Sequence, residues 1–543
     1  MMPTSAHQID EAVASRRWRI LGVLVLSLLV VVLDTSILNV ALRRLSEPKP
    51  RGLGTTPSEL EWILNAYTLA FAGLLFTWGV LGDRIGRKTT LLCGMAAFGV
   101  FSALSAFAAS PAELIATRAL MGVSGAAVLP STLSIISNVF EPAERSRAIA
   151  IWSGAVGIAI AAGPVIGGLL LAHFWWGSVF LVNVPVCTVA VALMLAWVPN
   201  SRDPDPGRLD PVGVVLSLAG IVAVVFGVIH GADGWGNAVV WLAIGGGGLL
   251  LAAFIAWERR APNPVLHLEL FRIPQFSAAL ALTWLVFFAL MGEFFFLAFY
   301  LQAARGLSPL DAGLSVVPLA VGQLAFASRS PRFVARFGAY RVTAVGMVLM
   351  GSAYAFFVFA GAHTPTWALE LCLFVEGVGL ANVTPPTTAT IMASVPREKA
   401  GAGSAIGNTM RQVGGAVGVA VFGTILATLY RSHITPSLRT VSALARDPAL
   451  LHTVSASISA TQAYAGSAGA GVAARLSGPA TASFVDAVHV VALGAALIGA
   501  VGAGVALRWL PRRALAIPAP AEPLEPVALE RIVEEGAPEP ALR

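Results

Sequence analysis

The sequence predicts an all-α membrane protein that crosses the bilayer about fourteen times. Three observations predict this fold class. Hydrophobic residues make up 57% of the 543 residues, charged residues make up only 12%, and the mean hydropathy is +0.78. Soluble domains contain about 25% charged residues, and one membrane-spanning helix needs about 20 mainly apolar residues. Apolar runs of that length recur along the chain, which places the protein outside the soluble class.

The apolar runs fall into two sets. The first set of predicted spans lies near 19–42, 59–81, 89–109, 112–137, 147–172, 178–198, 211–232 and 238–257. The second set lies near 277–303, 309–329, 340–361, 366–394, 401–429 and 485–509. The first run continues through Asp34 without a small-residue cleavage site. We therefore interpret it as an uncleaved span and not as a signal peptide.

The basic residues predict the orientation of the chain. With the N-terminus in the cytoplasm, the cytoplasmic loops and flanks contain 22 Lys and Arg residues, and the outer loops contain 9. Cytoplasmic loops carry the excess of basic residues in membrane proteins, so we expect both termini inside a bacterial inner membrane. The net charge of +6 then reflects membrane orientation and not nucleic-acid binding.

The predicted domains follow from the same runs. We expect a cytoplasmic N-terminus (1–18), an N-terminal six-helix bundle (19–198), a linker with two extra transmembrane helices (199–276), a C-terminal six-helix bundle (277–510) and a disordered cytoplasmic tail (511–543). The C-terminal bundle includes an outward loop, 430–484, which is rich in Ala, Ser, Thr and Gly. That loop is either disordered or carries a short helix.

An internal repeat supports two related halves. The segment Gly79–Lys88 joins the second and third spans, and a weaker copy, Ala335–Arg341, joins the tenth and eleventh. Pairing Gly86 with Gly338 aligns Arg84 with Arg336. Transporters are often built from two such halves, with the substrate site near the middle of the membrane.

Several motifs, in order along residues 19–510, show that the chain resembles the major facilitator superfamily, in particular its 14-helix drug:proton antiporter branch. The first-span motif is matched by Leu33-Asp34-Thr35 and Asn39-Val40-Ala41, with departures at Ser36, Leu38 and Arg43. The fourth-span motif is matched at Arg118, Gly122 and Gly125. The resemblance implies two six-helix bundles with two extra central helices, a monomer, and export of small molecules in exchange for protons.

Among the charged residues inside predicted spans, the candidates for a functional role are Asp34, Arg118, Glu293 and Glu376. Embedded charges are costly, so they usually face a cavity or a partner. We predict that these four residues couple transport to protons, a role that the resemblance extends to Arg118. The alternative for Asp34 is a fixed structural partner for a hydroxyl group or for Arg118. Arg411, in the thirteenth span, is a further embedded cation, for which Glu376 or a backbone carbonyl is a candidate partner.

An aromatic span surrounds Glu293 and suggests a substrate site. A carboxylate beside aromatic rings suits an amphipathic, cationic ligand, because it supplies charge while the rings supply apolar and cation–π contact. We place Glu293, Phe287, Phe295 and Asn39 among the substrate-binding residues. The alternative is an aromatic span that faces lipid or the core.

Two glycine-containing motifs complete the candidate residues. The turn after the second span is predicted to gate the carrier through Asp83, Arg84, Gly86, Arg87 and Lys88. There, Asp83 is expected to cap a helix or to pair with basic groups across the boundary between the halves. The fifth span matches the family's antiporter motif, which marks exporters, at Gly154, Gly157, Gly163, Pro164, Gly167 and Gly168.

The sequence favours a carrier over an enzyme. It has no Walker loop, nucleophile elbow, metal-ligand spacing or catalytic triad. We therefore expect no cofactor, a small-molecule substrate, protons as the driving ion, and the lipid bilayer as the surroundings. Two alternatives stay open: a proton-coupled nutrient importer on the same fold, and a membrane sensor that transports nothing.

Overall fold

The structure is a computed structural model that describes residues 15–201, 210–232, 234–261, 266–395 and 400–512, and these residues contain helices and no strand. The predicted N-terminal and C-terminal extensions lie mostly outside this range. The N-terminal half comprises α2 (Arg17–Ser46), α3 (Pro57–Ile85), α4 (Arg87–Ala106), α5 (Pro111–Gly125), α6 (Val128–Val139), α7 (Pro142–His173), α8 (Ser178–Leu181) and α9 (Asn183–Trp197). Two further helices, α10 (Pro211–Gly231) and α11 (Ala238–Glu258), follow it.

The C-terminal half begins after a short 3-10 turn, Leu268–Arg272. Its helices are α12 (Pro274–Phe299), the π-helical turn η2 (Tyr300–Ala304), α13 (Pro309–Ser315), α14 (Val317–Ala327), α15 (Ser330–Phe337), α16 (Ala339–Phe357), α17 (Thr366–Ala393), α18 (Ala400–Leu438) and α22 (Ala470–Trp509). Three short helices lie between α18 and α22, namely α19 (Ser442–Arg446), α20 (Pro448–Ser455) and α21 (Ile458–Ser467).

The helices confirm the predicted membrane fold. Among the described residues, thirteen helical segments are long and apolar enough to cross a membrane. The remaining predicted span, 147–172, falls within α7, whose 32 residues include the apolar stretch Ile158–His173. The pairs α5–α6, α8–α9 and α13–α14 each form one span, because each break occurs inside one apolar run.

Local sequence signals begin and end these helices. Thr56, Ser110, Asp210 and Ser308 each accept a hydrogen bond from the first turn of the next helix, and a proline follows each of them. A capping side chain followed by proline is a strong helix start. Gly86 separates α3 from α4 at φ +108°.

The predicted internal repeat is visible in the backbone. Gly338 separates α15 from α16 at φ +83°, as Gly86 does between α3 and α4. Residues with a side chain rarely adopt this region, so both turns depend on glycine. The equivalent conformations support the pairing of Gly86 with Gly338.

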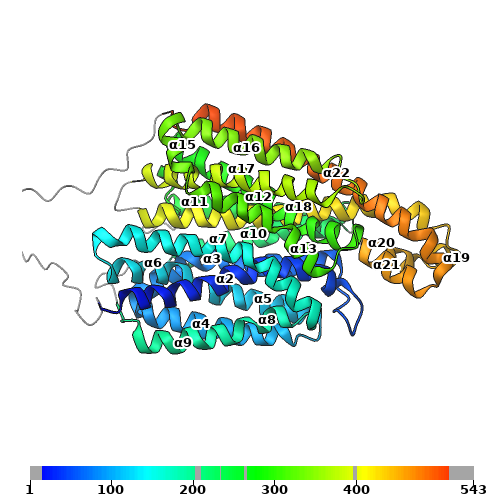
Figure 1. Ribbon diagram of the computed structural model, residues 1–543, viewed down its shortest axis with the longest axis horizontal. Coiled ribbons are helices and arrows are strands. Elements are labelled where there is room, and N and C mark those ends of the chain that lie inside the picture. The colour runs from blue at the N-terminus through cyan, green and yellow to red at the C-terminus, as the bar shows by residue number, and fades with distance from the viewer. Residues whose placement is uncertain (1–14, 202–209, 233, 262–265, 396–399, 513–543) are drawn as a thin grey trace, which may run out of the picture.

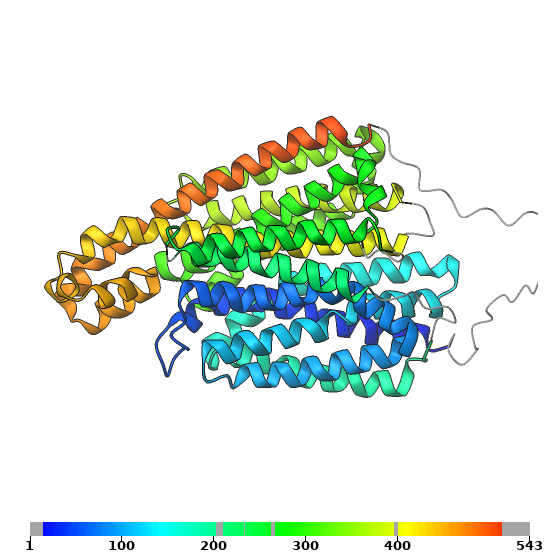
Figure 2. The same ribbon diagram turned by 180° about the vertical axis from the view of Figure 1, so that it is seen from behind.

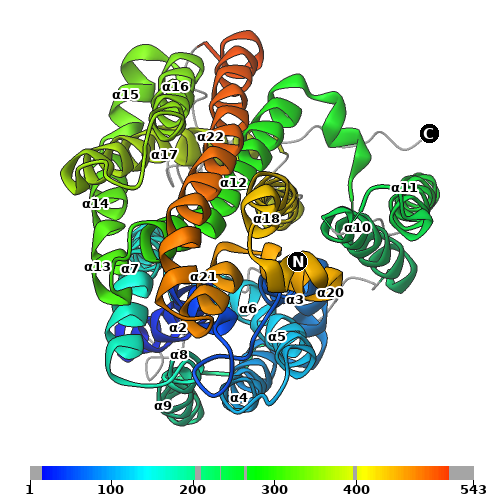
Figure 3. The ribbon, with the colours of Figure 1, turned by 90° about the vertical axis from the view of Figure 1, so that its right-hand side faces the viewer.

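The two halves lie side by side, with the N-terminal half below the C-terminal half in Figure 1. Seen end-on, α10 and α11 lie together on one flank, outside the two halves (Figure 3). α10 packs on both α3 and α18, and so covers one side of the boundary between the halves. We call this boundary the seam.

The segment 430–484 is a helical extension that projects beyond the bundle (Figure 2). α18 and α22 both continue into it, and α19 to α21 close it. The Tyr430 hydroxyl donates to Thr461 Oγ1 at 2.7 Å, and Gln462 Nε2 donates to the Ala303 carbonyl at 2.9 Å. Of the two structures that the sequence left open for this loop, the helical one is found. We call this side of the molecule the hairpin end, and the opposite side, where α2 begins and α22 ends, the terminal end (Figure 1).

Candidate functional site

A buried ion pair lies in the core of the N-terminal half. Asp34 of α2 and Arg118 of α5 form a salt bridge, and their side chains are 0% and 1% exposed. Asn183 of α9 donates from Nδ2 to the other carboxylate oxygen of Asp34 at 2.9 Å. The structure therefore brings together two of the predicted coupling residues. Removal of either Asp34 or Arg118 would leave the charge of the other residue buried and uncompensated.

Two further contacts hold Arg118 in place. Its Nε donates to the Ile63 carbonyl at 3.3 Å, and its guanidinium lies 4.3 Å from the centre of the Tyr67 ring. Asn183 also donates to Ser102 Oγ at 3.1 Å. Asn183 and Tyr67 were not predicted from the sequence as members of this cluster. Asn183 is a polar residue within a predicted span, and such residues usually have a partner.

The C-terminal half has a buried pair of acids. Glu293 of α12 and Glu376 of α17 interact with each other, and both side chains are 0% exposed. Tyr354 of α16 donates its hydroxyl proton to Glu376 Oε1 at 3.0 Å. Within the described part of the chain, no basic side chain forms a salt bridge with either acid. The two remaining coupling candidates thus share one apolar core.

Arg411 does not pair with Glu376, so the suggested partner was wrong. The Arg411 guanidinium lies 5.0 Å from the centre of the Phe287 ring, and its Nε has no hydrogen-bond partner among the described residues. The physical reason lies in the helix faces. Arg411 shares a face of α18 with Gly415 and Gly418, which pack on α12. Glu376 instead contacts Glu293 and Tyr354 inside the bundle.

The predicted substrate-binding residues are not gathered in one pocket. Phe287 lies under Arg411, while Phe295 packs edge-on against Phe299 at 5.8 Å. Asn39 donates from its amide to the Thr35 carbonyl at 3.2 Å. Glu293 is fully buried against Glu376. In this conformation these residues do not form a single ligand site.

A further buried acid, Glu61, lies at the seam and was missed from the sequence. It is 0% exposed on α3, and its carboxylate lies against Gly423 of α18 in the other half. A side chain at position 423 would collide with that carboxylate. The apolar residues that follow Glu61, from Trp62 to Leu64, were the signal that it is embedded.

The antiporter motif of α7 packs against both halves at once. Gly163 lies against Ser36, and a Cβ at Gly167 would lie 2.9 Å from Ile37, both on α2. A Cβ at Gly168 would lie 2.6 Å from the Pro309 carbonyl oxygen of α13, in the other half. Small residues let membrane helices approach this closely. The motif therefore forms part of the seam at the hairpin end. Nothing is described of the surroundings of Gly157.

Polar bonds also cross the seam at the hairpin end. Gln302, in the π-helical turn η2, donates from Nε2 to the Val40 carbonyl at 2.9 Å, and Arg43 donates to the Gln302 carbonyl. Local π-helical turns are frequent at functional sites. Arg43 is one of the positions at which the chain departs from the family motif.

Cavities along this part of the seam are too small for a substrate. One is lined by Asn39, Pro164 and Gln302, and another by Pro57, Phe295 and Gly423; each holds about 30 Å³. A water molecule occupies about 30 Å³ in the liquid, whereas ligand pockets measure about 300–1,000 Å³. The seam is therefore closed at these two points of the hairpin end.

The predicted gating turn is held by its own half. Arg87 forms a salt bridge with Asp83 and donates from Nη1 to the Gly79 carbonyl at 3.1 Å. Gly86, at the N-cap of α4, has no side chain to cap that helix. Lys88 donates to the Leu195 carbonyl at 3.1 Å. A Cβ at Gly86 would lie 2.5 Å from Asn200 Oδ1, whereas Arg84 is exposed. Asp83 thus pairs with a basic residue of its own half, and its helix-capping role stays a prediction.

Glycine substitutions in the antiporter motif test the closed seam. We expect Gly168→Val to reduce transport strongly, because its side chain would collide with the Pro309 carbonyl and prevent closure at the hairpin end. Gly154→Ala is the matched control, since a Cβ at Gly154 meets nothing within 4 Å. Transport by both variants, at matched expression, measures the effect. Equal activities would contradict the proposed role of the contact.

Comparisons with known proteins agree with the fold and the motifs. The family model described as Major Facilitator Superfamily matches residues 24–419. A multidrug efflux pump, LfrA, of Mycolicibacterium smegmatis is 38% identical over 77% of this chain and 83% of its own. A tetracenomycin C resistance and export protein of Streptomyces glaucescens is 34% identical over 78% of both chains. The methyl viologen resistance protein SmvA of Salmonella typhimurium is 32% identical over 77% of this chain and 84% of its own.

Solved structures share the same fold. A bacterial homolog of the human lysosomal transporter Spinster, in an inward-facing and unoccupied conformation, has a TM-score of 0.60 at 17% identity, over 91% of this chain and 98% of its own. The peptide transporter POT in complex with sulfate has a TM-score of 0.58 at 15% identity, over 91% and 96%. The chain is a multi-pass membrane protein, and it belongs to the Major Facilitator Superfamily.

Proposed function

We propose that this protein is a proton-coupled antiporter that exports small amphipathic, cationic molecules from the cytoplasm by alternating access. The observation that carries the proposal is that each half contains a buried cluster of ionisable residues. Between the halves, contacts close the seam toward the hairpin end. The efflux and resistance functions in the names of its relatives support export of a drug or a metabolite.

Alternating access explains the position of the seam contacts. The described contacts between α7 and α13, and between α2 and η2, lie toward the hairpin end. With the hairpin end outside the cell, as the basic residues predict, these contacts close the outer side of the seam. An exporter loads its substrate in that state. The termini are then cytoplasmic, and the bacterial inner membrane supplies the proton gradient.

The two buried clusters suit proton coupling in different ways. Asp34 pairs with Arg118, so protonation of Asp34 would break a buried ion pair and release Arg118 to other partners. Glu293 and Glu376 lie together without a basic partner, so the pair can hold and exchange a proton. One charge moving across 100 mV is worth about 2.3 kcal/mol, which is enough to concentrate a substrate about fiftyfold. No nucleotide or other cofactor is needed.

Efflux of a fluorescent cationic dye from energised cells tests the function. We expect cells that express the protein to exclude the dye, and a protonophore to abolish the exclusion. Greater dye accumulation in expressing cells would favour the importer. No flux of any dye or metabolite tried, in either direction, would favour the sensor and overturn the proposal.

Arg43 offers a separate test of closure. We expect Arg43→Ala to weaken the closed hairpin end, because it removes the bond from α2 to the Gln302 carbonyl. A hydrogen bond from a charged donor contributes about 1.5–3 kcal/mol, so the population that is open at the hairpin end should rise at least tenfold. Labelling of a cysteine placed at Asn39 by a membrane-impermeant thiol reagent measures this opening. Unchanged labelling would show that the bond from Arg43 to the Gln302 carbonyl does not keep the hairpin end closed. The control is Arg44→Ala, which removes a salt bridge to Glu47 on the same side of the seam.

A further inference from the structure

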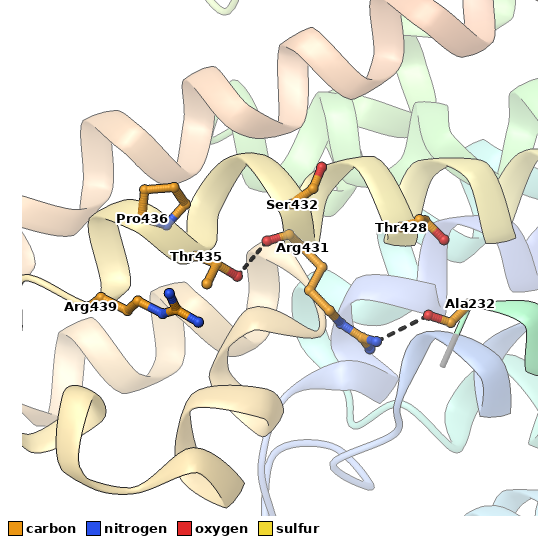
Figure 4. Close-up of a pocket in the computed structure, with 7 residues that line it drawn as sticks. All are labelled: Ala232, Thr428, Arg431, Ser432, Thr435, Pro436 and Arg439. Carbon is orange, nitrogen blue, oxygen red and sulfur yellow. Dashed lines mark hydrogen bonds between the residues drawn. The ribbon is translucent and has the colours of Figure 1, made fainter. Parts of the chain in front are cut away.

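A cavity of about 520 Å³ lies at the hairpin end, outside the seam between the halves. It is formed by α18 where that helix continues into the hairpin, and by Ala232 at the end of α10 (Figure 4). Arg431, Thr435 and Arg439 follow one another at intervals of four residues, so their side chains lie on one side of α18. Two guanidinium groups thus face one space, beside the Thr435 hydroxyl, which donates to the Arg431 carbonyl at 2.6 Å.

The level of this cavity in the membrane follows from the helices around it. α10 has 21 residues, and at 1.5 Å per residue it is about 31 Å long, close to the hydrocarbon thickness of a bilayer. Trp235 and Trp241 follow it, both exposed, with ring centres 5.8 Å apart. Exposed tryptophans mark the membrane–water interface. Ala232 therefore lies where the hydrocarbon meets the lipid headgroups.

α18 places Arg431 at the same level. No charged residue lies between Arg411 and Arg431, and this uncharged stretch is about 30 Å long. Arg431 donates from Nη1 to the Ala232 carbonyl at 3.0 Å, which joins the two helices at that point. Arg439 lies farther along α18, on the side of the water. The cavity thus extends from the edge of the hydrocarbon into the headgroup region.

The polar groups that line the cavity are mainly donors. None of the described residues that line it is acidic. Thr428 lines its membrane side, and its buried hydroxyl has no hydrogen-bond partner among the described residues. No salt bridge of Arg439 occurs in the described ranges. The lining therefore offers positive charge and an unused hydroxyl group to an anion that also reaches into the hydrocarbon.

A neighbouring cavity of about 620 Å³ shares Ala232 and Arg431 with the first one. Its lining includes His230, His452 and one acid, Glu59. The Glu59 carboxylate already accepts hydrogen bonds from the backbone and side chain of Thr56, at 2.8 and 3.0 Å. The two cavities together leave room for a headgroup and its glycerol, with a surplus of basic groups.

We propose that the cavity lined by Arg431, Thr435 and Arg439 binds the phosphate group of an anionic phospholipid in the leaflet at the hairpin end. Guanidinium groups bind phosphate through two parallel hydrogen bonds, and the acyl chains would lie along the lipid-facing side of α10 and α18. Because the bound lipid would bridge these helices, it would hold α10 against the seam. The proposal does not depend on which substrate is transported.

Lipid binding to the detergent-purified full-length protein tests this inference. Native mass spectrometry would count phosphatidylglycerol and phosphatidylcholine molecules that stay bound during titration. We expect tighter binding of phosphatidylglycerol, and a loss of about fivefold in its affinity for Arg439→Gln, the value of one basic residue near an anionic surface. Arg446→Gln is the matched control, because Arg446 is an exposed arginine on α19 outside the cavity.

The remaining measurements separate the lipid from other anions and from misfolding. Thermal unfolding without lipid should be the same for Arg439→Gln and the wild type. Equal binding of the two lipids by the wild type would overturn the proposal. So would equal losses in the Arg439 and Arg446 variants. Displacement of phosphatidylglycerol by millimolar inorganic phosphate would show a site for free anions and overturn the lipid assignment.

Discussion

Asp34→Asn is expected to reduce dye efflux to the level of cells that lack the protein. The substitution removes the negative partner of Arg118 and leaves that guanidinium buried among Ile63, Tyr67 and Asn183. Breaking a buried ion pair by removing one partner costs about 3–5 kcal/mol in soluble proteins. Three quantities are measured for this variant: the rate of dye efflux, the sensitivity of efflux to a protonophore, and the melting temperature of the purified protein.

A second variant separates coupling from stability. In Asp34→Asn/Arg118→Gln both charges are gone, so the buried charge that destabilises the single variant is absent. We expect the double variant to recover most of the lost stability, as pairs in direct contact are not additive, and to stay inactive in proton-driven efflux. If the double variant also recovers efflux, the Asp34–Arg118 ion pair serves only to hold α2 against α5. Asp34 is then a fixed structural partner of Arg118 and does not couple transport to protons.

The fold was predictable because hydropathy records which segments are buried in lipid. The predicted spans coincide with α-helices or with pairs such as α13–α14, and the glycine repeat identified equivalent turns at Gly86 and Gly338. The hairpin was not predictable in the same way. Its helices α19 to α21 are short and rich in Ala and Ser, so they carry no long apolar run. They are held instead by tertiary contacts such as the one from Tyr430 to Thr461.

The site was predictable residue by residue but not as an arrangement. Embedded charge identified Asp34, Arg118, Glu293 and Glu376, because charge inside a span is unusual. Which of them face each other depends on the rotation of each helix. α12 is buried on nearly every side from Phe276 to Phe299, so its sequence has no polar face that shows where Glu293 points. For the same reason the Arg411–Glu376 pairing was wrong, and the contact of Glu61 with Gly423 was missed.

Glu376→Gln is expected to abolish proton-driven export while leaving the fold intact. Glutamine keeps the shape of the side chain and can still accept the hydrogen bond from Tyr354, but it cannot exchange a proton. Because Glu293 and Glu376 have no salt-bridge partner among the described residues, neutralising one of them leaves no uncompensated charge behind. The melting temperature should therefore stay the same or rise, in contrast to Asp34→Asn.

Proteoliposomes distinguish a lost proton step from a lost substrate site. With equal pH on both sides, exchange of labelled for unlabelled substrate needs alternating access but no net proton transfer, so we expect Glu376→Gln and Glu293→Gln to retain it. An imposed pH gradient should drive accumulation in the wild type and not in these variants. Glu370→Gln, on the same helix but only half-buried, is the control. Gradient-driven accumulation by a Glu293→Gln/Glu376→Gln double variant would place the coupling elsewhere, with Glu61 at the seam as the next buried acid to test.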